Sequence, residues 1–208
     1  ILDQDTIRGS SLRAGPLLGD IDGDSLIEAV LGTRTGKLYV WKIEDGKLSL
    51  MSGFPVSLPD AIYATPSAFD IDKDGEKEIL VSDEDQKLYA IDAEGNIIFS
   101  VPTGAPGRGT PSFLEGTIYF LSADGRLFLI SPQGEKVDSL LPPYTALTTS
   151  SLAIGDINRD SVEEIIAPTA KGIFWILSPD GDSLVARDFG FKDPGPPAIG
   201  NVDPDPYL

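Results

Sequence analysis

The sequence predicts an all-β protein made of repeated four-stranded antiparallel sheets. Three observations predict this fold class: short apolar runs bounded by turn residues, a landmark spacing of about 45 residues, and a high content of turn-forming residues. The 208 residues include 22 Gly and 17 Pro, and 41% are hydrophobic. This composition suits a loop-rich β protein better than a helical one.

A proline or serine marks the start of each repeat. The marks are separated by 50, 45, 40 and 46 positions, and they are Pro16, Pro66, Pro111, Ser151 and Pro197. Four strands per unit of this length are typical of β-propeller blades. We therefore expect one β-propeller domain or fragment, with blades at about 14–61, 62–108, 109–149 and 150–196. Part-blades at 1–13 and 197–208 indicate either a small closed ring, in which 1–13 supply a late strand, or a slice of a six- to eight-bladed ring.

Each repeat has room for four strands. The first strand is short, the second follows a loop, and the third alternates bulky residues over 37–41, 87–91, 126–130 and 173–177. A Gly turn and a more polar fourth strand follow each third strand. First strands are expected at 16–19, 66–69, 111–114, 151–155 and 197–200. The aromatic side chains of the third strands are expected to fill the space between neighbouring sheets, and they are Tyr39, Trp41, Tyr89, Phe128 and Trp175.

An Asp-rich loop follows the first strand in three repeats. Side-chain oxygens stand at positions one, three, five and nine, and the backbone carbonyl of position seven is available as a further ligand. Because Ca²⁺ takes about six to eight oxygen ligands, we predict about three calcium sites. The ligands predicted for the first loop are Asp20, Asp22, Asp24, Leu26 and Glu28; for the second, Asp70, Asp72, Asp74, Glu76 and Glu78; for the third, Asp156, Asn158, Asp160, Val162 and Glu164. A partial fourth loop begins with Asn201, Asp203 and Asp205.

The loops differ from the EF-hand, which also opens with alternating acids. An EF-hand needs an acid at position twelve and a helix on each side, whereas position twelve is Leu31, Val81 or Ala167 and the flanks are β-rich. Mg²⁺ fits less well because it demands a smaller and stricter octahedron. The third repeat replaces the loop by Glu115-Gly116, so we predict that this blade holds no metal.

The charge and the missing residue types exclude several functions. The formal net charge of -17 opposes binding to nucleic acid or an anionic membrane. The absence of Cys and His removes disulfides, thiolate chemistry and the usual general base. No apolar run approaches the ~20 residues of a membrane-spanning helix, so membrane insertion is not expected. A chain that begins at Ile1 is expected to be a mature or excised piece.

The repeats resemble the FG-GAP repeat, the calcium-binding blade of integrin α-subunit propellers, which also occurs in surface proteins related to the VCBS group. The resemblance rests on the Asp-rich loops, on Gly15-Pro16, Thr65-Pro66 and Thr110-Pro111, and on endings such as 36–41. It implies structural Ca²⁺, an extracellular, secreted or cell-surface location, and a partner on the face opposite the calcium loops. The third-strand endings also resemble quinoprotein propeller repeats, which supports the fold more than a quinone cofactor.

Three possibilities for the function remain open, and the least specific is a spacer within a larger surface protein. The first is a non-catalytic module for cell-surface adhesion or for protein or glycan recognition. Its candidate partner-binding residues are Arg34, Tyr63, Arg108, Tyr144 and Lys171. The alternative is the scaffold part of a propeller enzyme, such as a calcium-dependent polysaccharide lyase or a quinoprotein. The lack of His and of an isolated acid/base pair favours the non-catalytic interpretation.

Overall fold

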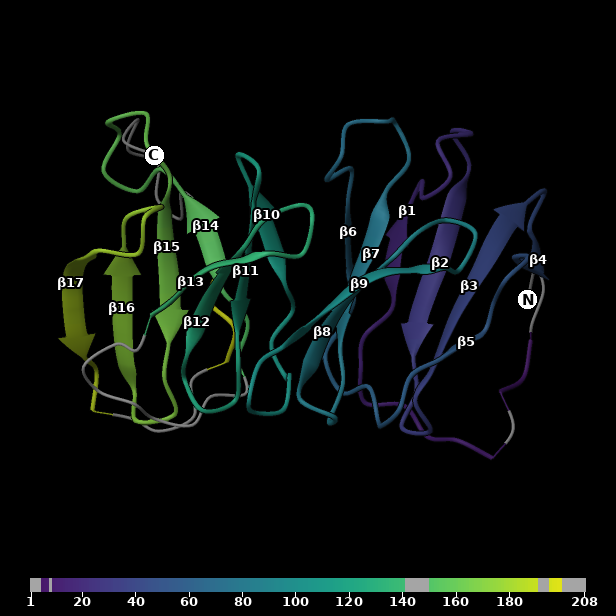
Figure 1. Cartoon of the computed structure of the whole chain (residues 1–208), viewed down its shortest axis with the longest axis horizontal. Coiled ribbons are helices and arrows are strands. Elements are labelled where there is room, and N and C mark those ends of the chain that lie inside the picture. Colours follow the sequence, from purple (N-terminus) through teal and green to yellow (C-terminus); the bar gives the residue numbers. More distant parts are fainter. Residues whose placement is uncertain (1–4, 8, 141–149, 191–194, 200–208) are drawn as a thin grey trace.

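The protein folds into four antiparallel sheets that stand side by side (Figure 1). A computed structural model describes residues 5–7, 9–140, 150–190 and 195–199. These residues form seventeen strands and no helix, and they include no segment that could cross a membrane as a helix. The all-β class predicted from the sequence is therefore confirmed.

Each sheet uses strands that are consecutive in the chain. The first sheet contains β1 (Leu17–Gly19), β2 (Ile27–Gly32), β3 (Lys37–Glu44), β4 (Lys47–Leu50) and β5 (Val56–Ser57). The second contains β6 (Ser67–Phe69), β7 (Glu78–Ser82), β8 (Lys87–Ile91) and β9 (Ile97–Pro102). The third contains β10 (Ser112–Leu114), β11 (Thr117–Leu121), β12 (Leu127–Ile130) and β13 (Lys136–Leu140). The fourth contains β14 (Ala153–Gly155), β15 (Glu164–Pro168), β16 (Ile173–Leu177) and β17 (Ser183–Asp188).

Within every sheet the strands lie in the order first, second, third, fourth, and each pairs antiparallel with the next. This arrangement is that of a propeller blade. The Asp-rich loops leave the first strands at one end of the sheets, and the turns between second and third strands lie at the other end (Figure 1). The fold therefore separates two faces: a loop face and a turn face.

The first sheet divides its outer strand into two pieces. β4 pairs with one end of β3, from Trp41 to Glu44, and β5 pairs with the other end, at Lys37 and Leu38. Five residues connect β4 to β5 without pairing in the ladder. This insertion accounts for the longest spacing in the repeat, the 50 residues between Pro16 and Pro66.

The third sheet has the tight hairpin that the sequence predicts. Leu114 pairs with Thr117, so only Glu115 and Gly116 form the turn. Both have positive φ, 46° and 84°, as a two-residue turn of type I′ requires. The turn leaves no space for an Asp-rich loop in this blade.

Hydrophobic side chains fill the three spaces between neighbouring sheets. Strand β7 shows how this works, because all five of its residues are buried. Ile79 and Val81 point into the core shared with the first sheet, whereas Leu80 points into the core shared with the third. A third core joins the third and fourth sheets around Trp175. Of the aromatic residues expected in these spaces, Tyr89, Phe128 and Trp175 lie in them. Tyr39 and Trp41 belong to none of the three cores and stack on each other instead, with ring centroids 5.2 Å apart, so the expectation was wrong for these two.

The second residue of each Asp-rich loop connects the loop to these cores. Ile21 is fully buried in the core between the first two sheets, and Ile71 is buried in the core between the second and third. Ile157, in the last blade, is only partly buried. The difference follows from the sheet order, because no further sheet packs against Ile157 among the described residues.

The two ends differ from the expected part-blades. Residues 5–7, 9–13 and 195–199 form no strand. A strand forms where a neighbour accepts its hydrogen bonds, and these segments pair with no strand in the described part of the chain. They contact the sheets through single interactions instead: Trp41 Nε1 donates to Asp5 Oδ2 at 2.8 Å, Arg34 N–H donates to Ser11 O at 3.1 Å, and Ile199 lies against Gly155.

We predict that Ile71→Ala lowers the free energy of unfolding by about 2–4 kcal/mol, because it leaves a cavity in a closed core. Ile157→Ala, at the equivalent position of the last blade, is the matched control and should cost about half as much. Urea unfolding of both variants in excess calcium measures the difference. Equal losses would contradict the role assigned to Ile71 in joining two blades.

Candidate functional site

The three Asp-rich loops share one backbone conformation, although their sequences differ. Positions four and six are left-handed in every loop; the residues and φ angles are Gly23 (73°), Ser25 (69°), Lys73 (70°), Gly75 (100°), Arg159 (64°) and Ser161 (70°). Left-handed φ is uncommon for residues other than Gly. Its repetition at Ser25, Lys73, Arg159 and Ser161 indicates that surrounding hydrogen bonds determine the loop conformation.

Those hydrogen bonds come from the loop acids. The backbone N–H of position six donates to the carboxylate of position one at 3.0, 3.2 and 2.9 Å in the first, second and third loops. The N–H of position seven donates to the carboxylate of position five at 2.9, 2.9 and 2.8 Å. The acids at positions one and five therefore shape the loop, and Asp70 and Asp156 accept loop hydrogen bonds on both carboxylate oxygens.

The glutamate at position nine is buried in all three loops. Glu28, Glu78 and Glu164 begin or lie in the second strand of their sheets, and each Oε2 accepts a hydrogen bond from the N–H of loop position two, at 2.8, 2.9 and 3.0 Å. Their side chains are at most 4% exposed. A buried carboxylate is costly unless its remaining oxygen also has a partner.

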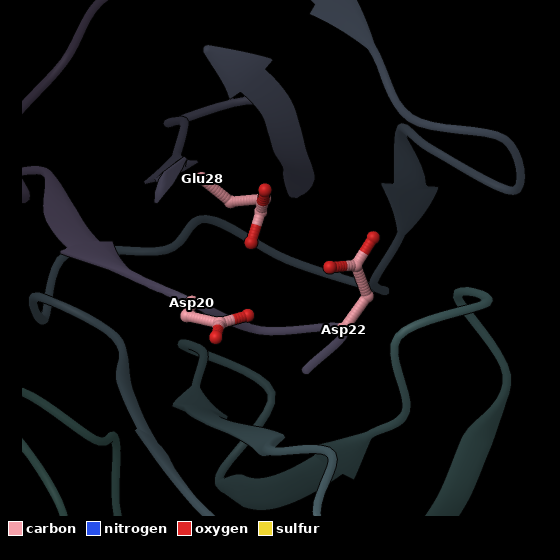
Figure 2. Close-up of side chains that lie close together, drawn as sticks. All are labelled: Asp20, Asp22 and Glu28. Atoms are coloured by element: carbon pink, nitrogen blue, oxygen red, sulfur yellow. The ribbon is translucent and has the colours of Figure 1, made fainter. Parts of the chain in front are cut away.

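In the first loop, three carboxylates surround a shared space (Figure 2). One oxygen from each of Asp20, Asp22 and Glu28 lies within 4.8 Å of the others. Two oxygens here, Asp20 Oδ1 and Glu28 Oε1, are buried and have no hydrogen-bond partner. Burial also raises the pKa of Glu28. This set of hard oxygen donors fits a divalent cation such as Ca²⁺, which would supply the missing partner.

Lys42 brings a positive charge to the same loop. It lies opposite Glu28 in the pairing of β2 with β3. Its Nζ is 2.9 Å from Asp22 Oδ2 and also forms an ion pair with Asp24. These contacts hold the pKa of Asp24 below its usual value and raise that of Lys42. Lys42 would therefore compete with a metal ion for Asp22 and Asp24.

The second loop repeats the acidic triad without such a lysine. Asp70, Asp72 and Glu78 each place an oxygen within 4.8 Å of the others, and burial raises the pKa of Glu78. The two loops are also connected, because Lys77 N–H donates to Ile21 O at 2.8 Å. An ion in either loop would therefore support a segment that contacts the other.

The third loop does not bring three acidic oxygens together in the described structure. Asn158 replaces the Asp of the other loops. Its Nδ2 donates to Glu164 Oε1 at 2.7 Å and to Asp160 Oδ2 at 3.1 Å. The amide thus satisfies the glutamate oxygen that has no partner in the first loop.

The structure places the other predicted ligands of the first two loops outside the acidic triads. Asp24 and Asp74 lie outside the two triads and cap backbone N–H groups instead. The carbonyls of Leu26, Glu76 and Val162 stay predicted ligands. The charge of Glu94 raises the pKa of the Glu76 side chain. Asn201, Asp203 and Asp205 lie outside the described residues.

The turn face gathers three of the predicted partner-binding residues. Arg34 and Arg108 both lie over the ring of Tyr63, with guanidinium carbons 5.6 and 5.7 Å from its centroid. Sequence reasoning missed a further member, Arg13, at 5.4 Å. The repeat spacing could have found it, because Arg13, Tyr63 and Arg108 each stand three residues before a repeat-marking proline. Lys171 is exposed in the turn between β15 and β16, and Tyr144 lies outside the described residues.

Comparison with protein families gives one match, between residues 20–81 and the FG-GAP-like repeat. The matched segment contains the first two loops and the strands between them, from β2 to β6, and it ends within β7. This agrees with the resemblance predicted from the sequence. Comparison with curated proteins gives no match.

Comparison with solved structures supports the propeller fold. BBS1N, in a complex with ARL6DN, matches with a TM-score of 0.65 and 13% identity, over 90% of this chain and 58% of that one. The computationally designed Ika8 protein matches with a TM-score of 0.66 and 17% identity, over 88% of this chain and 52% of that one. BamB from Moraxella catarrhalis matches at 0.50 and 16%, over 93% of this chain and 79% of that one. The chain thus spans between half and three fifths of the length of the first two.

We predict that Lys42→Met raises the calcium affinity of the first loop by roughly tenfold, because it removes the competing charge while keeping most of the side-chain volume. The second loop should be unaffected. Lys87→Met, which breaks an ion pair with Asp85 at the turn face, is the matched control. Calcium titration by calorimetry measures both. An unchanged first site in Lys42→Met would contradict the competition.

We predict that Glu28→Gln changes stability with opposite sign in chelator and in calcium. Because burial raises the folded-state pKa of Glu28 above the unfolded value, the folded protein binds this proton more tightly. Without metal, the contribution of Glu28 to the free energy of unfolding therefore falls as the pH rises from its unfolded-state pKa to its folded-state pKa. Above the folded-state pKa, the full cost of burying the charged carboxylate is present.

At pH 7 in chelator, Glu28→Gln should stabilise the protein by about 1–3 kcal/mol, because it removes the unpartnered buried charge. In saturating calcium it should destabilise the protein, because a metal ligand is lost. Melting temperatures at pH 7 and pH 4 in both conditions test this. The same sign of change in chelator and in calcium would show that Glu28 does not bind the ion.

Proposed function

We propose that this β-propeller with FG-GAP-like repeats is a non-catalytic module, stabilised by Ca²⁺ in its Asp-rich loops, that binds a protein or glycan partner at its turn face. The observation that carries the calcium proposal is the pair of buried oxygens without a partner, Asp20 Oδ1 and Glu28 Oε1, inside an acidic triad. Hydrogen bonds within the protein do not satisfy them, and a hard cation would.

The proposal assigns the strongest site to the second loop. Its triad has the same three positions, and the ion pairs around it do not include a lysine on Asp70, Asp72 or Glu78 within the described structure. The first loop binds less tightly because of Lys42. The third binds most weakly, because the Asn158 amide already occupies the glutamate oxygen.

The contacts of the loops support a structural role for the ion. The triad joins the end of a first strand to the start of a second strand. Position two of the same loop, Ile21 or Ile71, is buried in the core shared with the next blade. Calcium would therefore stabilise both the blade and its packing, to the extent that the folded chain binds it better than the unfolded chain does.

An extracellular or cell-surface location follows from the same proposal. FG-GAP repeats are typical of extracellular proteins, and near-millimolar calcium outside cells would fill even modest sites. The two faces then have separate tasks. The loop face binds the ion, and the turn face, where Arg34, Tyr63 and Arg108 come together, is available to a partner.

Calorimetric titration with calcium, together with thermal melting in calcium and in chelator, tests this proposal. We predict a higher melting temperature in calcium, by about 5 °C or more, and tight binding that Asp72→Ala abolishes at one site. The matched control is Glu135→Ala, which removes an exposed acid from the third blade, the one without a loop. No heat of binding and no shift in melting for the wild type would refute calcium stabilisation.

A further inference from the structure

Three arginines surround a single tyrosine on the turn face. The guanidinium carbons of Arg13, Arg34 and Arg108 lie 5.4, 5.6 and 5.7 Å from the centroid of the Tyr63 ring. Arg13, Tyr63 and Arg108 occupy the same position in three consecutive blades, four residues before the first strand. Arg34 comes from the turn between β2 and β3. We call these four residues the arginine cluster.

The positive charge of the cluster is only partly balanced. Arg108 binds Glu84 through two hydrogen bonds, from Nε to Oε1 at 3.1 Å and from Nη2 to Oε2 at 3.2 Å. Arg13 and Arg34 are exposed and form no ion pair with any residue of the described structure. The cluster thus leaves two guanidinium groups free in a chain with 33 acidic and 16 basic residues.

We propose that the arginine cluster binds carboxylate side chains on a segment of a partner protein. Glu84 shows how a carboxylate is received there, by the planar fork of an arginine that matches both oxygens. Tyr63 holds the remaining two arginines beside this pair, since both guanidinium groups make cation–π contacts with its ring. A short acidic segment of the partner places one carboxylate against Arg13 and another against Arg34.

The charge of the whole protein favours a short acidic segment over a long polyanion. A net charge of -17 repels an extended nucleic acid or polyuronate along most of its length. A peptide with a few acidic residues gains the local contacts and experiences little of that repulsion. The cluster is also assembled from exposed and partly buried residues, which suits contact with a protein surface.

This inference rests on the proposed use of the turn face and names the chemistry of its partner.

The test measures binding of a fluorescein-labelled Gly-Glu-Glu-Glu-Glu-Gly peptide by anisotropy in excess calcium. We predict that the wild type binds this peptide and not its Gln analogue. The double variant Arg13→Gln/Arg34→Gln should bind at least tenfold more weakly, by the usual size of charge-assisted hydrogen bonds. Increasing salt should weaken binding.

Arg187→Gln/Lys47→Gln is the matched control, because both residues are exposed on outer strands, β17 and β4, and the pair of substitutions removes two positive charges, as the double variant does. It should bind like the wild type, and melting of all variants should be unchanged. Equal binding by the wild type and the double variant, or no binding by the wild type, would overturn the inference. Tighter binding of an oligogalacturonate of equal charge would overturn the assignment to a protein segment. Calcium titration of the same samples separates these outcomes from failure of the calcium proposal.

Discussion

The hydrogen bond between the buried glutamate of each Asp-rich loop and the N–H of loop position two organises the structure around the loops. It is made three times, at 2.8, 2.9 and 3.0 Å. The N–H belongs to an isoleucine, whose side chain lies between blades in the first two loops. The glutamate that accepts the bond begins or lies in the second strand. One carboxylate therefore fixes the loop, the strand pair and the contact with the next sheet together. Because this carboxylate is buried, its other oxygen must also find a partner, and the loop chemistry follows from that requirement.

The three loops meet this requirement in different ways. The first leaves Glu28 Oε1 without a hydrogen bond and places Lys42 on the neighbouring acids. The second gathers a triad of acids. The third uses the Asn158 amide, a neutral donor that satisfies Glu164 within the protein. A single substitution at position three thus changes whether the glutamate needs an external cation. Positions four and six have left-handed φ in all three loops, so the proposed calcium affinity could vary from blade to blade without a change in the fold.

The fold could be predicted in detail from the sequence, but the contacts of the sites only in part. Third strands such as 87–91 could be predicted because successive side chains of a strand point to opposite faces, and bulky side chains on both faces pack against the neighbouring sheets. The acidic positions one, three and nine were predictable from their spacing. The role of Lys42 was not, because it stands 20 positions from Asp22 and comes near it only through the register of β2 with β3. The split outer strand of the first sheet depends likewise on tertiary pairing. Arg13 could not be predicted from a local motif, because only its spacing from the repeat-marking proline relates it to Tyr63 and Arg108.

The propeller architecture explains how a strongly acidic chain can keep a basic site. First strands run toward the loop face, so the residues that precede them in successive blades come together on the turn face. The same geometry that collects Arg13, Tyr63 and Arg108 at one end collects the loop acids at the other. Bound calcium would neutralise charge only where the acids are concentrated. The arginine cluster would keep its local charge whether or not calcium is bound, because Glu84 is the only carboxylate paired with it in the described structure. The proposed stabilisation by calcium and the proposed recognition of a partner would therefore be separable in this fold, because substitutions on one face leave the other face intact.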